Sequence, residues 1–213
     1  MKRILSAVLA VLMIFALAGC GKDVKGTVKN KDQNAIFKSG KTDGMVYENT
    51  FLGVGCELPA GWTFYTDKQI EELNKSVAES ADKDFADDLS RVNIIYDMSA
   101  YSGDGSAVIS VTFEKMTEKK VKELDMEGYC KNTVKAFLDS YDQQGFTRHE
   151  GAAITAKIGT KECHGINVWV ANGTQKVFTK SLFMKKGKYI ACISANAKSQ
   201  DTVDNLIKEF YLI

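Results

Sequence analysis

Six side chains in this sequence have the residue types that nucleophilic or metal chemistry uses. They are four of the five cysteines and both histidines: Cys56, Cys130, Cys163, Cys192, His149 and His164. Cys163 stands directly beside His164, a pair that suggests a thiol nucleophile and its base. Adjacent residues on a strand point to opposite faces of the sheet. We therefore expect that this pair cannot act together unless the strand is bulged there.

A zinc site needs three or four converging ligands, and Cys163, Cys192 and one histidine are the set that the sequence offers. The expected strand pairing argues against this set. It places Cys163 opposite residue 182 and Cys192 opposite residue 181 of a shared middle strand. The two cysteines are then ~9 to 10 Å apart on opposite faces, too far for a disulfide. We expect no metal site.

Cys56 and Cys130 fit the pattern of small core residues. Cys56 alternates with Val54 and Leu58, and Cys130 lies on the apolar stripe of an expected helix. Free cysteine is among the most buried residue types. The sequence does not decide whether these two form a disulfide, because a helix packed on a sheet can bring them together and export permits oxidation.

Five aromatic side chains are candidates for lining a ligand groove. The alternative is that they lie in the core or at its edge. They are Trp62, Tyr96, Tyr101, Trp169 and Phe178.

Beyond these residues the sequence contains no catalytic motif. It has no glycine-rich phosphate loop with its lysine, no Gly-x-Ser-x-Gly elbow, no His-Glu-x-x-His and no Cys-x-x-Cys. Its 213 residues include 28 basic and 27 acidic side chains, a balance too even for a nucleic-acid binder. We therefore expect a protein that is not an enzyme, holds no cofactor and binds no nucleic acid.

The first twenty residues predict an export signal. Lys2 and Arg3 precede an apolar run over residues 4–18, which has the length of a signal-peptide core and is shorter than the ~20 residues of a membrane-spanning helix. Leu17-Ala18-Gly19-Cys20 then resembles the lipobox of bacterial lipoproteins, in which the cysteine is diacylated and becomes the new N-terminus. The resemblance implies a lipid on Cys20, and two acyl chains hold a protein stably on a membrane. An ordinary secreted protein with an incidental cysteine is the alternative.

The chain divides into three parts. Residues 1–19 are the signal peptide, residues 20–44 are the lipidated cysteine with a flexible linker, and residues 45–213 are a single domain. The linker is rich in lysine, whereas the chain from residue 44 onward carries 20 basic and 24 acidic residues. The folded part is therefore acidic, which is a further reason to expect no nucleic-acid partner.

Strand patterns fall into groups that helices separate. Extended pieces are expected at residues 51–58 and 62–65, a hairpin at 92–101 and 106–116, and an antiparallel meander at 152–159, 163–170, 177–184 and 189–195. A helix is expected after Thr66, which with Gln69 three residues on forms a capping box. Further helices are expected from Asp125 to Gln143, and after Ser199 with Phe210 on the inner face. This order indicates an α+β fold, an antiparallel sheet flanked by helices.

One motif carries a family resemblance. Leu58-Pro59-Ala60-Gly61-Trp62, with the preceding stretch over residues 47–54, resembles the opening of a group of lipoproteins from Gram-positive bacteria. Their order of elements is similar to the PsbP-type fold, so the resemblance implies an α/β/α sandwich. It also implies a binding or assembly role without catalysis.

Together these features predict a protein on the outer face of the cell membrane, anchored by a lipid on Cys20. Its expected role is that of a non-catalytic binding or assembly module of the cell envelope, with an envelope protein as its partner. The alternative is a small-molecule-binding receptor for a transporter, which a single domain of this size disfavours.

Overall fold

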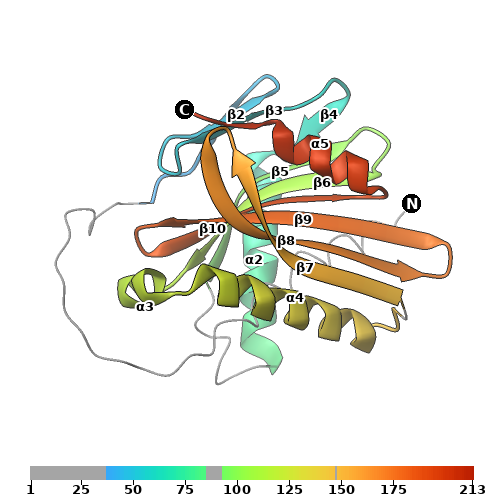
Figure 1. The fold of residues 1–213 in the computed structure, drawn as a ribbon. Coiled ribbons are helices and arrows are strands. Elements are labelled where there is room, and N and C mark those ends of the chain that lie inside the picture. Colours follow the sequence, from blue (N-terminus) through green and yellow to red (C-terminus); the bar gives the residue numbers. More distant parts are fainter. Residues whose placement is uncertain (1–36, 85–92, 147) are drawn as a thin grey trace.

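The structure, a computed structural model, describes residues 37–84, 93–146 and 148–213. These residues form two antiparallel sheets and four helices, the α+β fold that the sequence predicts (Figure 1). The predicted signal peptide and Cys20 lie outside the described residues.

Seven strands make up the main sheet, in the order β4, β5, β6, β10, β9, β8, β7. Their bounds are Trp62–Phe64 (β4), Asn93–Ser102 (β5), Ala107–Lys115 (β6), Arg148–Ile158 (β7), Lys161–Asn172 (β8), Gln175–Lys186 (β9) and Tyr189–Ala197 (β10). The predicted hairpin is β5 and β6, and the predicted meander runs from β7 to β10. Both are confirmed, and the last meander strand joins them by pairing with β6.

A second sheet of four short strands joins both ends of the described chain. It has the order β1 (Lys41–Asp43), β2 (Val46–Asn49), β3 (Val54–Glu57) and β11 (Phe210–Leu212). The expectation that the last helix carries Phe210 was wrong. The helix ends at Lys208, and Phe210 starts β11 by pairing with Cys56, which gives the edge of β3 a hydrogen-bonding partner.

The helices begin where the sequence places polar caps. They are α2 (Asp67–Asp84), α3 (Glu118–Glu123), α4 (Met126–Gln143) and α5 (Gln200–Lys208). Before α2, the Thr66 amide donates to Gln69 Oε1 over 2.9 Å and the Gln69 amide donates to Thr66 Oγ1 over 3.3 Å, the predicted capping box. Ser199 caps α5, which starts after it as expected, and Asp125, the expected first residue of α4, is instead its cap. The short α3, capped by Thr117, was not predicted.

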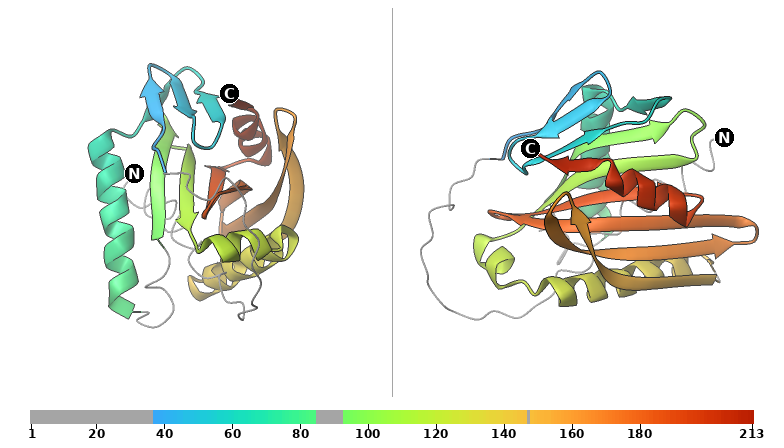
Figure 2. Two further views of the ribbon diagram at one scale, coloured as in Figure 1. Left: turned by 90° about the vertical axis from the view of Figure 1, so that its left-hand side faces the viewer. Right: turned by 45° about the horizontal axis from the view of Figure 1, so that its top comes forward.

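The main sheet separates two apolar clusters (Figure 2). We call one face of this sheet the upper face, and it packs against α5 and the small sheet. Ile109 and Ile193 of the main sheet belong to the same apolar cluster as Val54 and Phe210 of the small sheet. Its lower face packs against α4 through residues such as Phe137 and Phe183. The α2 helix lies along β5, where the Asn74 side chain bonds the backbone amide and carbonyl of Tyr96.

A glycine allows α4 to approach the lower face closely. A Cβ atom on Gly151 of β7 would lie 2.9 Å from Cγ1 of Val134 on α4 and 3.0 Å from Cγ2 of Val168 on β8. Both distances are too short for any larger side chain without movement of its neighbours. The packing of α4 on β7 and β8 therefore depends on this residue.

The folded part begins before residue 45, where the sequence analysis set its boundary. The ring of Phe37 lies 5.0 Å from that of Phe113 and 5.5 Å from that of Tyr189, between centroids, and residues 41–43 form β1. The single aromatic residue among lysines and small polar residues explains why composition assigned this stretch to the linker. Among the described residues, no helix is both long and apolar enough to cross a bilayer.

Candidate functional site

Cys163 and His164 do not form a catalytic pair. The ladder between β7 and β8 runs without a shift from Arg148 to Ile158, so no bulge turns the two side chains to one face. Cys163 is buried in the upper cluster, and its thiol donates only to the Lys161 carbonyl at 3.8 Å. His164 is half-buried on the other side of the strand.

The zinc ligands that the sequence analysis considered and argued against are also kept apart. Cys163 continues the β8–β9 ladder opposite Met184, and Cys192 pairs with Phe183, so the expected partners were each wrong by two residues. The turns contain only two residues each and begin at Gly173 and Gly187, whose φ angles are 59° and 57°. A register error of two residues does not move a side chain to the other face of the sheet. The prediction that Cys163 and Cys192 lie on opposite faces is therefore confirmed. The described residues hold no cluster of three metal-ligating side chains.

Cys56 and Cys130 are core residues on opposite sides of the main sheet. Cys56 belongs to the upper cluster and Cys130 to the lower one, and the four described cysteines are all free and buried. The disulfide that the sequence left open is therefore absent. Burial raises the pKa of Cys56 to about 12 and that of Cys130 to about 11, so neither is a thiolate at neutral pH.

The five aromatic candidates do not line one groove. Tyr96 is buried beside α2, and Tyr101 packs edge-on against Tyr65 at 5.6 Å between ring centroids. Trp62 and Phe178 pack on the rim of the upper cluster. Trp169 is half-buried, with the Lys176 ammonium 3.9 Å from its ring centroid and its indole N–H donating to Glu150 Oε2 over 3.3 Å. The core and its edge account for Tyr96, Trp62 and Phe178, whereas the half-buried rings of Tyr101 and Trp169 belong to neither apolar cluster.

The lower face carries a set of buried polar side chains that the sequence analysis missed. Four serines lie side by side across four strands, because Ser99 pairs with Ser110, Ser110 with Ser194, and Ser194 with Ser181. Polar residues also occupy the neighbouring rows. We call the whole set the polar layer: Ser99, Ser110, Thr112, Thr179, Ser181, Cys192, Ser194 and Asn196, which are buried, with Glu114, which is half-buried.

Several members of the polar layer bond one another. Ser181 Oγ donates to Ser194 Oγ over 3.0 Å, and Thr179 Oγ1 donates to Asn196 Oδ1 over 2.7 Å. The Cys192 thiol lies in hydrogen-bonding contact with Ser181 and Thr112, and its burial raises its pKa to about 12. Cys192 is therefore a neutral member of the network rather than a nucleophile.

The polar layer and the α4 helix that covers it also contain polar atoms without a partner. Among the described residues, three buried side-chain atoms have no hydrogen bond: Ser110 Oγ, Asn196 Nδ2 and Tyr141 Oη. Ser110 and Asn196 belong to the lower face, and Tyr141 belongs to the apolar cluster between α4 and that face. All three thus lie in the same layer of the molecule, and each is about 1% exposed.

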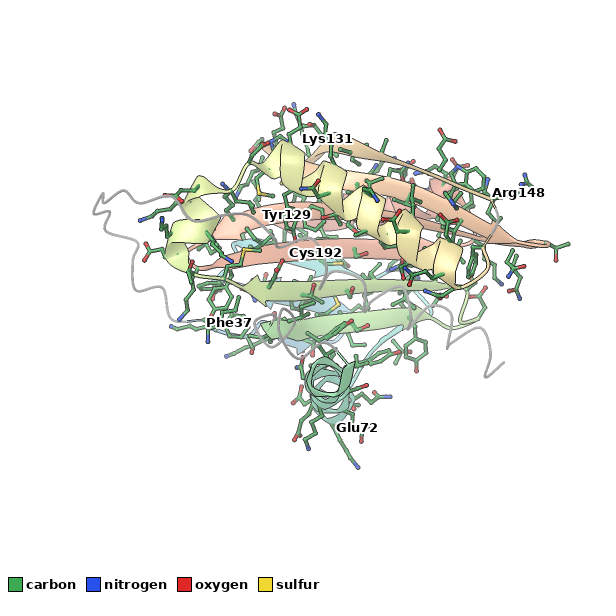
Figure 3. The ribbon with its side chains drawn as sticks, turned by 90° about the horizontal axis from the view of Figure 1, so that it is seen from below. Phe37, Glu72, Tyr129, Lys131, Arg148 and Cys192 are labelled. Carbon is green, nitrogen blue, oxygen red and sulfur yellow. The ribbon has the colours of Figure 1, made fainter. Side chains whose placement is uncertain are left out.

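Glu114 is the one carboxyl group of the polar layer. Its Oε2 accepts a hydrogen bond from the Tyr129 hydroxyl over 2.8 Å. Tyr129 belongs to α4, which covers this face of the sheet (Figure 3). Burial raises the pKa of Glu114 to about 7, although the hydrogen bond from Tyr129 acts in the opposite direction. Burial also raises the pKa of Tyr129, so the tyrosine stays a donor.

The unpaired groups of this arrangement can form hydrogen bonds to an uncharged partner. Two hydroxyls and one amide N–H are unpaired, the thiol is neutral, and no histidine or lysine is part of the polar layer. A signal for this layer does exist in the sequence, where polar residues occupy every second position at 110–112, 179–181 and 194–196. Such alternation is ordinarily typical of a solvated sheet face.

Comparison with known proteins adds little to this site. No family model matches the chain, and no curated protein is similar to it. The chain is similar in structure to LpqN of Mycobacterium tuberculosis, which is described as involved in cell envelope biogenesis. The two share 10% sequence identity, with a TM-score of 0.42 over 75% of this chain and 82% of LpqN. A likeness this weak transfers no activity, partner or ligand.

Proposed function

We propose that this protein is a lipid-anchored lipoprotein on the outer face of the cell membrane, with a PsbP-like domain that acts as a non-catalytic binding module of the cell envelope. The anchor is the lipid on Cys20. The ligand site of the module is the polar layer. The observation that supports binding is the gathering of Ser110 Oγ, Asn196 Nδ2 and Tyr141 Oη, all unpaired, in one layer.

Unpaired buried polar atoms are costly, which is why their position is informative. A buried donor or acceptor without a partner costs ~1 to 3 kcal/mol, and folded proteins contain few of them. Three in one layer are explained if another molecule supplies the missing hydrogen bonds. Asn196 Nδ2 requires an acceptor, whereas the hydroxyls of Ser110 and Tyr141 take either role.

The second candidate is a small-molecule-binding receptor for a transporter, and the position of the polar layer favours it. The layer is buried inside the domain, so a protein surface does not reach it. The large apolar side chains exposed in the described part are Met45, Leu212 and Ile213. Met45 lies next to Leu58 and Ile213 next to Gly53, at opposite ends of β3, so they do not form one patch for a protein partner.

Two measurements test the proposal. Cell fractionation should find the native chain in the membrane and Cys20→Ala released, and a Cys20→Ala chain that stays membrane-bound contradicts the anchor. Native mass spectrometry of the purified mature chain should show one bound molecule per chain, which is lost on denaturation.

Substitutions at Ser110 connect that bound molecule to the polar layer. Ser110→Ala should weaken its retention, whereas Ser140→Ala, the same truncation on the half-buried side of α4, should not. If no molecule is bound and Ser110→Ala simply raises the melting temperature, the hydroxyl is an unsatisfied core group and the polar layer is not a site.

A further inference from the structure

Lysines gather at one end of the molecule, where the turn between β9 and β10 lies beside α3 (Figure 1). The Lys185 ammonium donates to the Leu124 carbonyl over 2.6 Å, and the Met116 amide donates to the Lys188 carbonyl over 2.9 Å, so the turn and α3 form one surface. We call this surface the basic end: Lys115, Lys119, Lys120, Lys122, Lys185, Lys186 and Lys188. All of these side chains are exposed except Lys119, which is half-buried.

The basic end carries more positive charge than its surroundings neutralise. Its seven lysines share residues 115–125 and 185–188 with only three acidic residues, which are Glu118, Glu123 and Asp125. Glu118 is paired with Lys122 at 2.9 Å, and Asp125 uses its carboxylate to cap α4. Five of the lysines have no carboxylate oxygen within 4.0 Å among the described residues: Lys115, Lys119, Lys120, Lys186 and Lys188.

This concentration contrasts with the rest of the domain. From residue 44 onward acidic residues outnumber basic ones by 24 to 20, so a local excess of lysine leaves the remainder strongly acidic. A molecule with such separated charge is oriented by a charged surface, with its basic end toward negative charge and the remainder away from it.

The predicted linker, which joins Cys20 to the domain, meets the domain at this same end. Phe37, the first described residue, packs against Tyr189, which directly follows the lysines of the β9–β10 turn and pairs with Lys115. Figure 3 shows Phe37 at the end of the molecule opposite Arg148. If Cys20 carries the lipid, about 17 residues join it to Phe37, and the flexible linker that the sequence predicts there would have a root-mean-square span of roughly 20 to 25 Å.

We propose that the basic end seats the domain on the anionic phospholipid headgroups of the membrane that holds its anchor. This inference rests on the proposed anchoring at Cys20. A linker of this length keeps the basic end within a few Debye lengths of the bilayer, where lysines are attracted to an anionic surface. The domain is then oriented with its basic end toward the lipid, and the opposite end, near Arg148, faces outward.

Vesicle binding by the unlipidated chain tests this proposal. The probe is the chain from residue 20 onward with Cys20→Ala, which contains every described residue. It should co-sediment with vesicles of 30% phosphatidylglycerol in phosphatidylcholine at low salt. It should not co-sediment with pure phosphatidylcholine, and 0.5 M salt should release it. The double variant Lys186→Glu/Lys188→Glu should bind the anionic vesicles at least tenfold more weakly.

A matched variant controls for net charge. Arg148→Glu/Lys198→Glu changes the same amount of charge on exposed residues at the opposite end of the strands, and its vesicle affinity should stay within twofold of the native chain. Equal weakening by both variants overturns the proposal, because attraction would then depend on net charge alone. Binding to soluble polyphosphate without binding to anionic vesicles also overturns it and indicates a wall polymer instead.

The outcome does not depend on the lipid at Cys20, because the vesicle probe has none. Failure of the anchor appears only in the fractionation of Cys20→Ala cells, whereas failure of the basic end appears only in the vesicle assay. Urea unfolding of both double variants should match that of the native chain, since the substituted residues are exposed.

Discussion

The Tyr47 hydroxyl donates to the Asp97 carboxylate over 2.6 Å, and this contact connects the small sheet to the main one. Asp97 lies where the register of β5 against β6 shifts between Tyr96 and Met98, so the strand turns this side chain toward the small sheet. Its carboxylate also accepts bonds from Asn49 Nδ2 over 2.8 Å and from the Gly40 amide over 3.0 and 3.1 Å. One carboxylate thus orders the start of the domain.

Replacing Asp97 should therefore destabilise the domain strongly. Asp97→Ala leaves the buried Tyr47 hydroxyl without its acceptor and Asn49 Nδ2 with only the Lys38 carbonyl at 3.4 Å. Hydrogen bonds to a charged group contribute ~1.5 to 3 kcal/mol each. We expect a loss of about 3 to 5 kcal/mol in the free energy of unfolding, measured by urea titration. Tyr47→Phe should cost about 1 to 2 kcal/mol. A loss below ~1 kcal/mol for Asp97→Ala would show that the carboxylate does not hold the two sheets together.

Glu114 should make stability depend on pH. Its folded pKa of about 7 lies above the ordinary value of 4.5, so the folded protein holds a proton that the unfolded chain releases. Stability should therefore fall as pH rises from about 4.5 to 7, by at most ~3 kcal/mol. Glu114→Gln keeps an acceptor for Tyr129 and removes this dependence. It should be more stable than the native chain at pH 8 and similar to it at pH 5, as measured by urea unfolding at both pH values.

The thiols report on both the core and the anchor. The four described cysteines are buried and free, so a thiol reagent should react with none of them in the folded protein within minutes. In denaturant, the mature chain purified from membranes should show four thiols if Cys20 carries a thioether-linked lipid. Five thiols would mean that Cys20 is unmodified. Fewer than four without reductant would reveal a disulfide.

Trp62 tests the motif that carried the family resemblance. Its ring is half-buried and packs on the rim of the upper cluster rather than inside it. Trp62→Ala should therefore cost about 2 to 3 kcal/mol, less than the 3 to 5 kcal/mol of a fully buried aromatic residue. Thermal unfolding of the variant measures this loss. A value below ~1 kcal/mol would indicate that the ring is free to contact a partner.

The sequence predicted the elements with local signals and missed those that depend on distant partners. Thr66 with Gln69 marked α2, and the glycines at 173 and 187 marked the meander turns, because caps and turns need particular residues at particular positions. No local pattern indicated β11, whose three residues form a strand because they pair with the edge of β3. The strand register at each meander turn was predicted wrongly by two residues, because a two-residue turn and a four-residue turn can have the same composition.

The polar layer illustrates a further limit of sequence patterns. Ser181, Ser194 and Ser110 alternate with apolar residues, which ordinarily indicates a strand with one face in water. The structure buries both faces, and nothing in the local sequence separates a solvated serine from a buried one. Only strand order brings the serines together, because β10 of the meander pairs with β6 of the hairpin.

The pairing of β11 with β3 has a consequence for how the chain folds. A polypeptide made from its N-terminus exposes residues 54–56 early, but their partners at 210–212 are synthesised much later. Until then, the apolar side chains of β3 lack part of their packing, and the edge of that strand lacks its hydrogen-bonding partner. The domain should thus reach its native state only after synthesis has passed residue 212, and folding should be slowed by this distant contact. Truncation before Phe210 should leave a chain that is recognised by proteases as unfolded.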